Sequence, residues 1–357
     1  MCMRILVTVC ISANLAIAQA PSGAGDTGAD AAVPHYVDPV GQLYGAVARL
    51  CKQQINALRK NAESSDPESE LKYGMVCETR PQLLGISLNS GRLQATDWYA
   101  KAANQGNPFA ERLLASSNIG NHAFALEWYR RAASQGDIES AYSVGQMYLD
   151  GDVSGKPDPS EAVFWFLIAA KGGDIQAAFK VGSFYECGCG TSKNDAEAAK
   201  WYRIAASRGW NAAQLALGNL YESGRGVAKD IQEAARWFGK AADRNGDAAY
   251  KYGLLIEQYP TLLGKSANEA RAPFRRTALL FKRDAASGDA SACLKLGQMY
   301  ESGMGVGRNF QEAYFWYSVG DVDDPSVRND IERVRKHLSA KQVANIERRI
   351  TKWNNDN

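Results

Sequence analysis

The stretch WYRRAASQGD at residues 128–137 decides the fold, because close copies of it return along the chain. The copies are WYAKAANQGN from Trp98, WFLIAAKGGD from Trp165, WYRIAASRGW from Trp201 and WFGKAADRNGD from Trp237. One catalytic site is normally enough for one protein, whereas self-similarity at a fixed period is typical of a repeated packing unit. The sequence therefore predicts an array of stacked repeats.

The tryptophans give the period of this array. Three consecutive intervals are 37, 36 and 36 residues, measured between Trp128, Trp165, Trp201 and Trp237. The next aligned position is Leu280, 43 residues further on, and Trp316 then restores the 36-residue step. We therefore expect an insertion near residues 257–273.

The first half of each unit predicts a helix built around a glycine. The stretch AAQLALGNLY at 212–221 has apolar residues at helical spacing on both sides of Gly218. A glycine inside a helix costs about 1 kcal/mol relative to alanine. Its return as Gly145, Gly182 and Gly297 therefore predicts a neighbouring helix that passes too close for a side chain.

The second half of each unit predicts another helix with its own start and stop signals. Asp230 precedes Glu233 by three residues, and the same spacing follows Asp158, Asn194 and Asn309, which is typical of a capping box. The aromatic pair and the Ala-Ala pair behind it predict the face that packs on the partner helix. Left-handed residues are expected to end these helices, and we assign them to Gly106, Gly136, Gly173, Gly209, Gly288 and Asn245.

The combined pattern A-x-x-x-L-G-x-x-Y-x-x-G-x-G-V-x-x-D and E-A-x-x-W-Y-x-x-A-A-x-x-G resembles the Sel-one-like repeat family, which is related to the tetratricopeptide repeat. Four units match closely, at 138–173, 175–209, 211–246 and 290–320, within an array of about six to seven units over 92–320. The resemblance implies an all-α fold, a right-handed α-solenoid of helix hairpins, and a role as a protein-binding adaptor. Bacterial relatives are often exported.

The segments outside the array have separate predicted roles. Residues 1–18 read as an export signal cleaved after Ala18, with an apolar run shorter than the roughly 20 residues needed to span a bilayer. Residues 19–40 form a leader with little to bury, 41–91 an N-terminal helical hairpin without the repeat signature, and 321–357 two capping helices. We expect a mature protein in the periplasm or outside the cell.

Five cysteines remain after removal of the signal. Cys51 and Cys77 fall on neighbouring predicted helices and are a candidate disulfide in an oxidising compartment. Cys187 and Cys189 occupy positions of a glycine loop, with a disulfide as the alternative interpretation, and Cys293 is expected to be a small buried residue.

The composition favours a binding protein over an enzyme. The net charge of +2 gives no electrostatic footprint for nucleic acid, and the three histidines lack ligand spacing, so we predict no cofactor, metal or catalytic residue. Ser69 and Lys72 have the Ser-x-x-Lys spacing of penicillin-recognising enzymes, but the two companion motifs are absent.

The leading hypothesis is an exported scaffold that binds a protein or peptide on the concave face of the solenoid. The alternatives are binding or hydrolysis of β-lactams or peptidoglycan fragments, and a permanent structural or assembly factor of an envelope complex. The partner-binding ladder is predicted at positions opposite the apolar stripe of the first helices, namely Ser143, Gln146, Lys180, Ser183, Asn219, Lys295 and Gln298.

Overall fold

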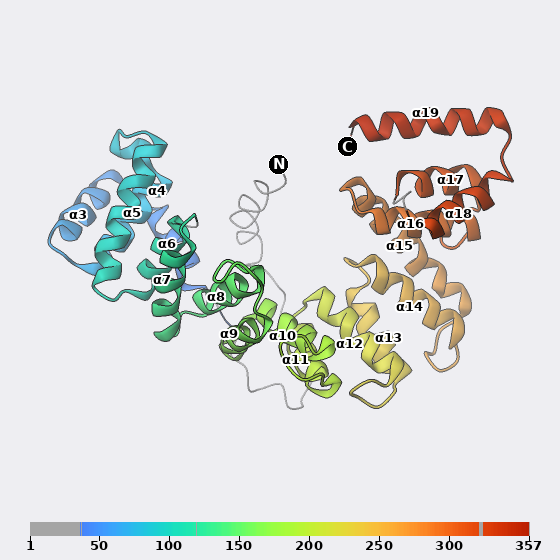
Figure 1. The fold of residues 1–357 in the computed structure, drawn as a ribbon, viewed down its shortest axis with the longest axis horizontal. Helices are drawn as coiled ribbons and strands as arrows, with labels where there is room; N and C mark the ends of the chain where they lie inside the picture. Colours follow the sequence, from blue (N-terminus) through green and yellow to red (C-terminus); the bar gives the residue numbers. More distant parts are fainter. Residues whose placement is uncertain (1–35, 37, 119, 321–323, 357) are drawn as a thin grey trace. The chain divides into compact units, whose positions relative to one another are not determined.

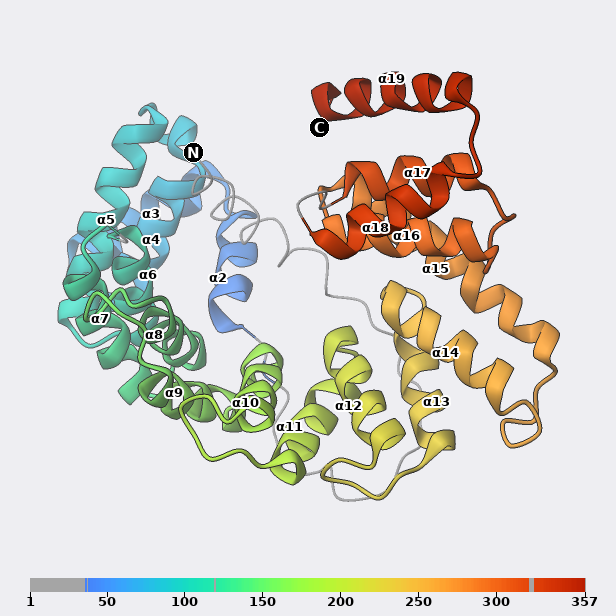
Figure 2. The same cartoon turned by 45° about the vertical axis from the view of Figure 1, so that its right-hand side comes forward.

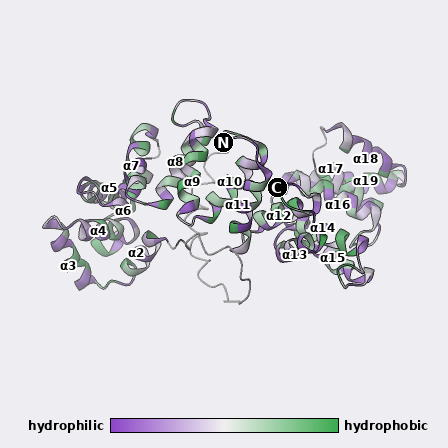
Figure 3. Ribbon diagram, turned by 90° about the horizontal axis from the view of Figure 1, so that it is seen from below, coloured by the Kyte–Doolittle hydropathy of each residue, from purple (hydrophilic) through white to green (hydrophobic). Residues whose placement is uncertain are grey.

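A computed structural model describes residue 36 and residues 38–356, apart from 119 and 321–323 (Figure 1). In that part of the chain all regular structure is helical and no strand occurs, which confirms the predicted all-α class. Apolar and polar residues alternate along individual helices (Figure 3), as expected for helices with one buried face. The predicted export signal and nearly all of the leader lie outside the described residues.

The chain divides into two compact units, and the first ends at Lys193. Its helices are α2 (Pro39–Val47), α3 (Lys52–Glu63), α4 (Pro67–Thr79), the 3-10 helix η1 (Pro81–Leu84), α5 (Leu88–Asn104), α6 (Pro108–Ser117), α7 (His122–Ser134), α8 (Ile138–Asp150), α9 (Pro159–Lys171) and α10 (Ile175–Cys187).

The second unit begins at Asn194. Its helices are α11 (Asp195–Ser207), α12 (Asn211–Ser223), α13 (Ile231–Ala241), α14 (Gly246–Gln258), the 3-10 helix η2 (Ala267–Ala270), α15 (Arg271–Ala286), α16 (Ala290–Ser302), α17 (Phe310–Val319), α18 (Pro325–Arg335) and α19 (Ala340–Asp356).

Consecutive helices pack as pairs in both units. Helices α4, α6 and α8 in the first unit and α12, α14 and α16 in the second unit are first helices, and each packs on the odd-numbered second helix that follows it. By its sequence α10, which ends the first unit, is also a first helix, and α11, which begins the second unit, is a second helix. Within each unit every second helix also packs on the first helix that follows it. This arrangement is a helical solenoid, in which a pair that cannot bury its apolar face alone buries it against the next one.

In most first helices a central glycine is in contact with an aromatic ring of the second helix. A Cβ atom on Gly218 would lie 2.5 Å from the ring of Phe238, and one on Gly145 would lie 3.0 Å from that of Phe166. These rings are fully buried. The predicted close approach at Gly145, Gly218 and Gly297 is therefore confirmed.

In most of these pairs the aromatic residue after the tryptophan is the more deeply buried one, whereas at Trp128 and Tyr129 the tryptophan is buried and the tyrosine is half-buried. Tyr202, Phe238 and Tyr317 are at most 2% exposed, whereas Trp165 and Trp201 are only half-buried. Trp128, Trp237 and Trp316 are buried between 6% and 8% exposure. The indole rings belong to the packed face, with the smaller ring behind them against the neighbouring backbone.

The N-terminal segment differs from the expected helical hairpin. It contains three helices, and the last of them, α4, packs principally on α5. A Cβ on Gly74 of α4 would lie 2.7 Å from the ring of Tyr99 in α5, which repeats the glycine-aromatic contact of the later pairs. Helix α4 is thus the first helix of a further pair, although its sequence has lost the rest of the repeat pattern.

The additional residues of the lengthened unit lie inside α15, and not near 257–273 as the sequence predicted. Gly253 of α14 is in contact with Phe274, which follows Phe238 by 36 residues. Ser266 and Glu269 cap the start of η2, at the positions that correspond to Asp230 and Glu233 at the start of α13. The start of this second helix therefore also keeps the 36-residue spacing. The seven extra residues follow Phe274 as two helical turns.

The start and stop signals are confirmed in most respects. Each of Asp158, Asn194, Asp230 and Asn309 accepts two backbone N–H groups of the following turn. Both halves of a capping box occur at α3, at η2 and at the start of α19, where Ser339 and Gln342 accept each other's backbone N–H, whereas glutamates such as Glu233 pair with basic side chains instead. All five predicted terminal glycines have positive φ.

Asn245 is an exception among the predicted helix ends. It has a φ of −126° and caps α14, accepting the N–H of Ala248 at 2.9 Å. Helix α14 begins nine residues after Trp237, whereas α12 begins ten residues after Trp201, so the asparagine serves the start of the next helix.

The two predicted terminal helices are present as α18 and α19. Val334 and Ile346 are buried, and Arg349 of α19 forms an ion pair with Glu312 of α17 at 2.8 Å. No described helix has the length and apolar character needed to cross a bilayer.

Candidate functional site

The predicted ladder residues occupy two recurring positions of the first helices, two residues before and one residue after the central glycine. In the first unit these are Ser143 and Gln146 of α8 and Lys180 and Ser183 of α10. In the second unit they are Asn219 of α12 and Lys295 and Gln298 of α16. Ser183 and Gln298 are exposed and the other five are half-buried.

The lysines of the ladder cover aromatic rings of the core. The ammonium group of Lys180 lies 5.3 Å from the ring centre of Phe166, and that of Lys295 lies 5.2 Å from that of Phe281. Burial lowers the pKa of Lys180. A lysine over the face of an aromatic ring gains cation–π attraction while its stem shields apolar surface.

Lys251 of α14 is a third such lysine, which the sequence analysis missed. Its ammonium lies 5.4 Å from the ring centre of Phe238. It stands two residues before Gly253, as Lys180 and Lys295 stand before their glycines. The shared offset was available in the sequence, but the rest of this first helix departs from the repeat pattern.

Ion pairs connect the first helices of the second unit. Lys251 Nζ lies 2.7 Å from Glu222 of α12, and Lys295 Nζ lies 2.6 Å from Asp247 of α14. Lys295 and Asp247 also line an open cavity of about 210 Å³ together with Arg244. The surface of α12, α14 and α16 thus presents alternating charges to solvent.

The remaining ladder residues bond mainly within their own helices. The Ser143 hydroxyl donates to the Glu139 carbonyl at 2.8 Å, and the Gln146 amide donates to Asp150 at 2.8 Å. The side-chain oxygen of Asn219 is buried and has no hydrogen-bond partner among the described residues.

Arg112 of α6 is the centre of a charge cluster in the first unit. Its guanidinium lies 2.9 Å from Asp38, 3.4 Å from Asp137 and in direct contact with Glu139. The Arg112 side chain is only 6% exposed. One cation therefore faces three carboxylates, which come from the segment before α2 and from the start of α8.

The surroundings of this cluster change the ionisation of Glu139. Burial, with the nearby charges of Asp38, Asp137 and Asp174, raises the Glu139 pKa to about 7, although Arg112 acts in the opposite direction. A carboxyl group in such a place titrates near neutral pH.

The segment before α2 lies across the first helices of this unit. Asp38 reaches Arg112 on α6, while α2 itself packs on α4, and Figure 2 shows α2 beside these first helices. Next to it is an open cavity of about 440 Å³, whose lining includes Tyr36, Phe109 and Ile138. The hydroxyl of Tyr36 is buried and has no hydrogen-bond partner within the described part of the chain.

Helix α2 is anchored more firmly than the segment before it. Val47 is 1% exposed, and the Tyr44 hydroxyl donates to Glu78 of α4 at 2.6 Å. Arg80 donates to the carbonyl of Leu50 at 2.7 Å. Sequence analysis missed both this anchoring and the Arg112 cluster, because the partners are 25 to 74 residues apart along the chain.

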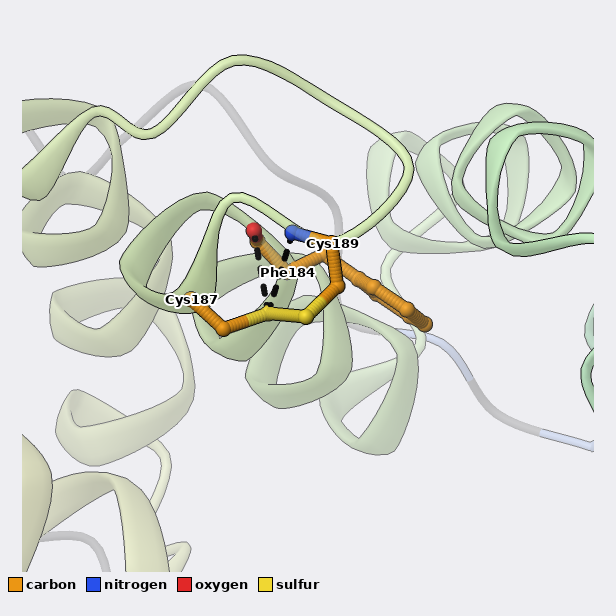
Figure 4. The surroundings of a disulfide bond; sticks show 3 residues. All are labelled: Phe184, Cys187 and Cys189. Carbon is orange, nitrogen blue, oxygen red and sulfur yellow. Dashed lines mark hydrogen bonds between the residues drawn. A yellow bond between two sulfur atoms is a disulfide. The ribbon is translucent and has the colours of Figure 1, made fainter.

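The cysteines do not form the disulfide that was predicted. Cys51 is an exposed thiol at the start of α3, whereas Cys77 is a buried thiol inside α4. The alternative considered for the glycine loop occurs instead, since Cys187 and Cys189 are joined by a disulfide (Figure 4). Cys293 is buried, as expected, and burial raises its thiol pKa to about 11.

The residues considered for chemistry have structural partners. Ser69 is buried at the start of α4, where its N–H donates to the capping Asp66 at 2.9 Å. The Lys72 ammonium lies 2.5 Å from Glu68. No cluster of three or more metal-ligating side chains occurs in the described residues.

Comparison with known proteins agrees with this geometry. Six segments match the Sel1 repeat, at 83–107, 119–137, 138–174, 175–210, 211–246 and 290–318, and together they span about half of the chain. The sequence matches none of the curated proteins.

Solved structures with a similar arrangement include a Sel1 repeat protein from Oxalobacter formigenes. It has 21% sequence identity and a TM-score of 0.56 over 83% of this chain and 90% of that one. A protective antigen of uropathogenic Escherichia coli, described as having this repeat fold, has 20% identity and a TM-score of 0.46 over 84% and 94% of the two chains. From the repeated segments and the paired helices, we conclude that this chain belongs to the Sel1 repeat family, whose repeats mediate protein interactions.

Proposed function

We propose that the protein is an exported scaffold that binds a partner protein or peptide on the face formed by its first helices. The main support is the recurrence of polar side chains at fixed positions of that face, one residue after the central glycine, including the exposed Ser183 and Gln298. Most aromatic residues of the second helices, in contrast, lie in the core, although Phe164 of α9 is exposed. An array of this kind offers a continuous surface to an extended partner.

Site-specific photo-crosslinking tests this proposal. A photoreactive amino acid replaces Ser183 or Gln298 on the first helices, and exposed Phe164 or Lys200 on the second helices as matched controls. The full chain is then irradiated in an envelope extract of its own organism. We expect one discrete cross-linked protein from the first-helix positions. Equal labelling from all four positions would contradict the proposal.

The alternative functions have their own experiments. Turnover of a chromogenic β-lactam that is lost in Ser69→Ala would support action on the cell wall, but the Ser69 and Lys72 contacts do not favour it. A partner that copurifies at fixed stoichiometry through gel filtration would support a permanent assembly factor.

Export rests on the sequence of residues 1–18. Fractionation of cells that express the full chain, with mass spectrometry of the mature N-terminus, tests it. We expect a periplasmic or extracellular protein that begins at Gln19, and an uncleaved protein in the cytoplasm would contradict export.

A further inference from the structure

Tyr36, Asp38 and Pro39 lie against the first helices in the way that a bound peptide would. Asp38 meets Arg112 of α6 at 2.9 Å, and Tyr36 lines the cavity beside the start of α8. The chain then continues into α2, which packs on α4 (Figure 2). One stretch of chain thus crosses three successive first helices.

The fit of this segment is incomplete. The cavity of about 440 Å³ beside it remains open, and its lining includes the apolar side chains of Pro39, Pro108, Phe109 and Ile138. The Tyr36 hydroxyl is buried with no partner in the described residues. A segment with a larger apolar side chain, or with a group that pairs at the Tyr36 position, would make more contacts here.

The crossing segment binds Arg112 through one carboxylate, that of Asp38. A guanidinium has five donors in a planar fork that matches a carboxylate. Asp137 and Glu139 belong to the start of α8 and stay in place, whereas Asp38 comes from the segment that crosses the helices. The Asp38 position is therefore the one that another chain can supply.

We propose that the surface around Arg112 is a binding groove for an extended acidic segment of a partner protein, and that Tyr36, Asp38 and Pro39 are its internal occupants. The partner segment carries an aspartate or glutamate with an aromatic residue before it and an apolar residue after it. This inference rests on the proposed function, since it names one part of the interaction surface. The partner has to displace Tyr36 and Asp38 before it binds.

The proposal is tested with a variant whose groove is vacated. In the full chain, Asp38→Lys places a cation next to Arg112 and expels the segment, while Asp97→Lys changes an exposed residue of α5 by the same charge. The probe is a fluorescent peptide HYVDPVGQ, identical to residues 35–42. Its binding is measured by fluorescence anisotropy at low salt, where charge interactions are least screened.

We expect Asp38→Lys to bind the peptide at least about tenfold more tightly than the wild type or Asp97→Lys, since a charge-assisted hydrogen bond contributes more than a tenfold factor. The peptide with asparagine in place of its aspartate, and the double variant Asp38→Lys/Arg112→Gln, should both lose this gain. Hydrogen exchange should increase at the N–H groups of Val40 and Gly41, which Asp38 holds in the wild type.

Two results would overturn the proposal. One is exchange that increases around Val40 with no peptide binding, and the other is exchange that does not change in Asp38→Lys. If Asp38→Lys unfolds the first unit, Asp38→Asn replaces it, because asparagine caps a helix as well as aspartate but carries no charge. Asp38→Asn should then gain peptide binding over the wild type, and equal binding would also overturn the proposal.

The two proposals can fail separately. Cross-links from Ser183 without peptide binding would leave the scaffold function intact. Peptide binding without any cross-linked partner would argue against the scaffold and not against the groove.

Discussion

Gly218 of α12 lies so close to the ring of Phe238 in α13 that a Cβ atom at this glycine would stand 2.5 Å from it. The same relationship joins Gly74 to Tyr99 and Gly145 to Phe166. Glycine weakens a helix by itself, so its presence here is explained by the short distance between the paired helices. This contact sets the close spacing of the helices in the pairs that contain it.

Substitution of Gly218 by alanine should therefore destabilise the protein. Overpacking of this kind costs about 1–3 kcal/mol, which exceeds the gain in helix propensity. Gly239→Ala in α13 is the matched control, because its Cβ would lie 3.4 Å from Tyr252, an ordinary contact. Gly239→Ala should be neutral or stabilising by up to about 1 kcal/mol. Urea unfolding measures both, and equal effects of the two substitutions would contradict the packing argument.

The two aromatic positions of the second helix should differ in their contribution to stability. Phe238→Ala removes a fully buried ring and should cost about 3–5 kcal/mol through cavity formation. Trp201→Ala removes a larger but half-buried ring, and its loss should be smaller. Thermal unfolding measured by circular dichroism compares them. A greater loss for Trp201→Ala would reverse the assignment of the deeper position.

The stability that capping gives the second helices should come from the N-cap residue alone. Asp230→Ala removes the acceptor of two backbone N–H groups, at 2.9 Å to Gln232 and 3.0 Å to Glu233, and should cost about 1 kcal/mol. Glu233→Ala removes only an exposed pair with Arg236 and should change stability by at most about 0.5 kcal/mol. Equal losses of stability in denaturant unfolding would show instead that Glu233 contributes to the cap, as in a full capping box.

Glu139 should make the stability of the first unit depend on pH. Its pKa is raised to about 7 by burial and by Asp38, Asp137 and Asp174, against the effect of Arg112. The folded state therefore favours the protonated form, and this contribution is present below the ordinary pKa of about 4.3 and is lost as the pH rises through 7.

Glu139→Gln removes the titration and keeps the shape of the side chain. Urea unfolding at pH 5 and pH 8 should show a smaller decrease in stability for Glu139→Gln than for the wild type. A larger decrease in the variant would contradict the raised pKa.

The sequence predicted the parts of the fold that repeat locally. Gly145, Gly218 and Gly297 each identify a first helix because a helix glycine needs a special reason, and that reason is the same in every unit. The pairing of α4 with α5 escaped prediction, because Gly74 is all that α4 retains of the first-helix pattern, although Tyr99 of α5 belongs to a close copy of the second-helix pattern.

The candidate site was less predictable than the fold. Helical spacing placed Ser183 and Gln298 on the exposed side of their helices, but it could not show that Lys295 pairs with Asp247, 48 residues away. The Arg112 cluster depends on Asp38, 74 residues from it along the chain. Contacts of this length are set by how helices stack, and no local pattern records them.

Helix α15 carries Phe274 and Phe281 seven residues apart, against Gly253 and Gly246 of α14. Seven residues make two turns with a drift of only about 20°, so both rings leave the helix on one side. An addition of five residues would instead rotate everything downstream by about 140° and bring Phe281 out to solvent. During evolution a second helix of such an array can therefore lengthen only in steps of about seven residues. Such a step leaves the units that follow unchanged.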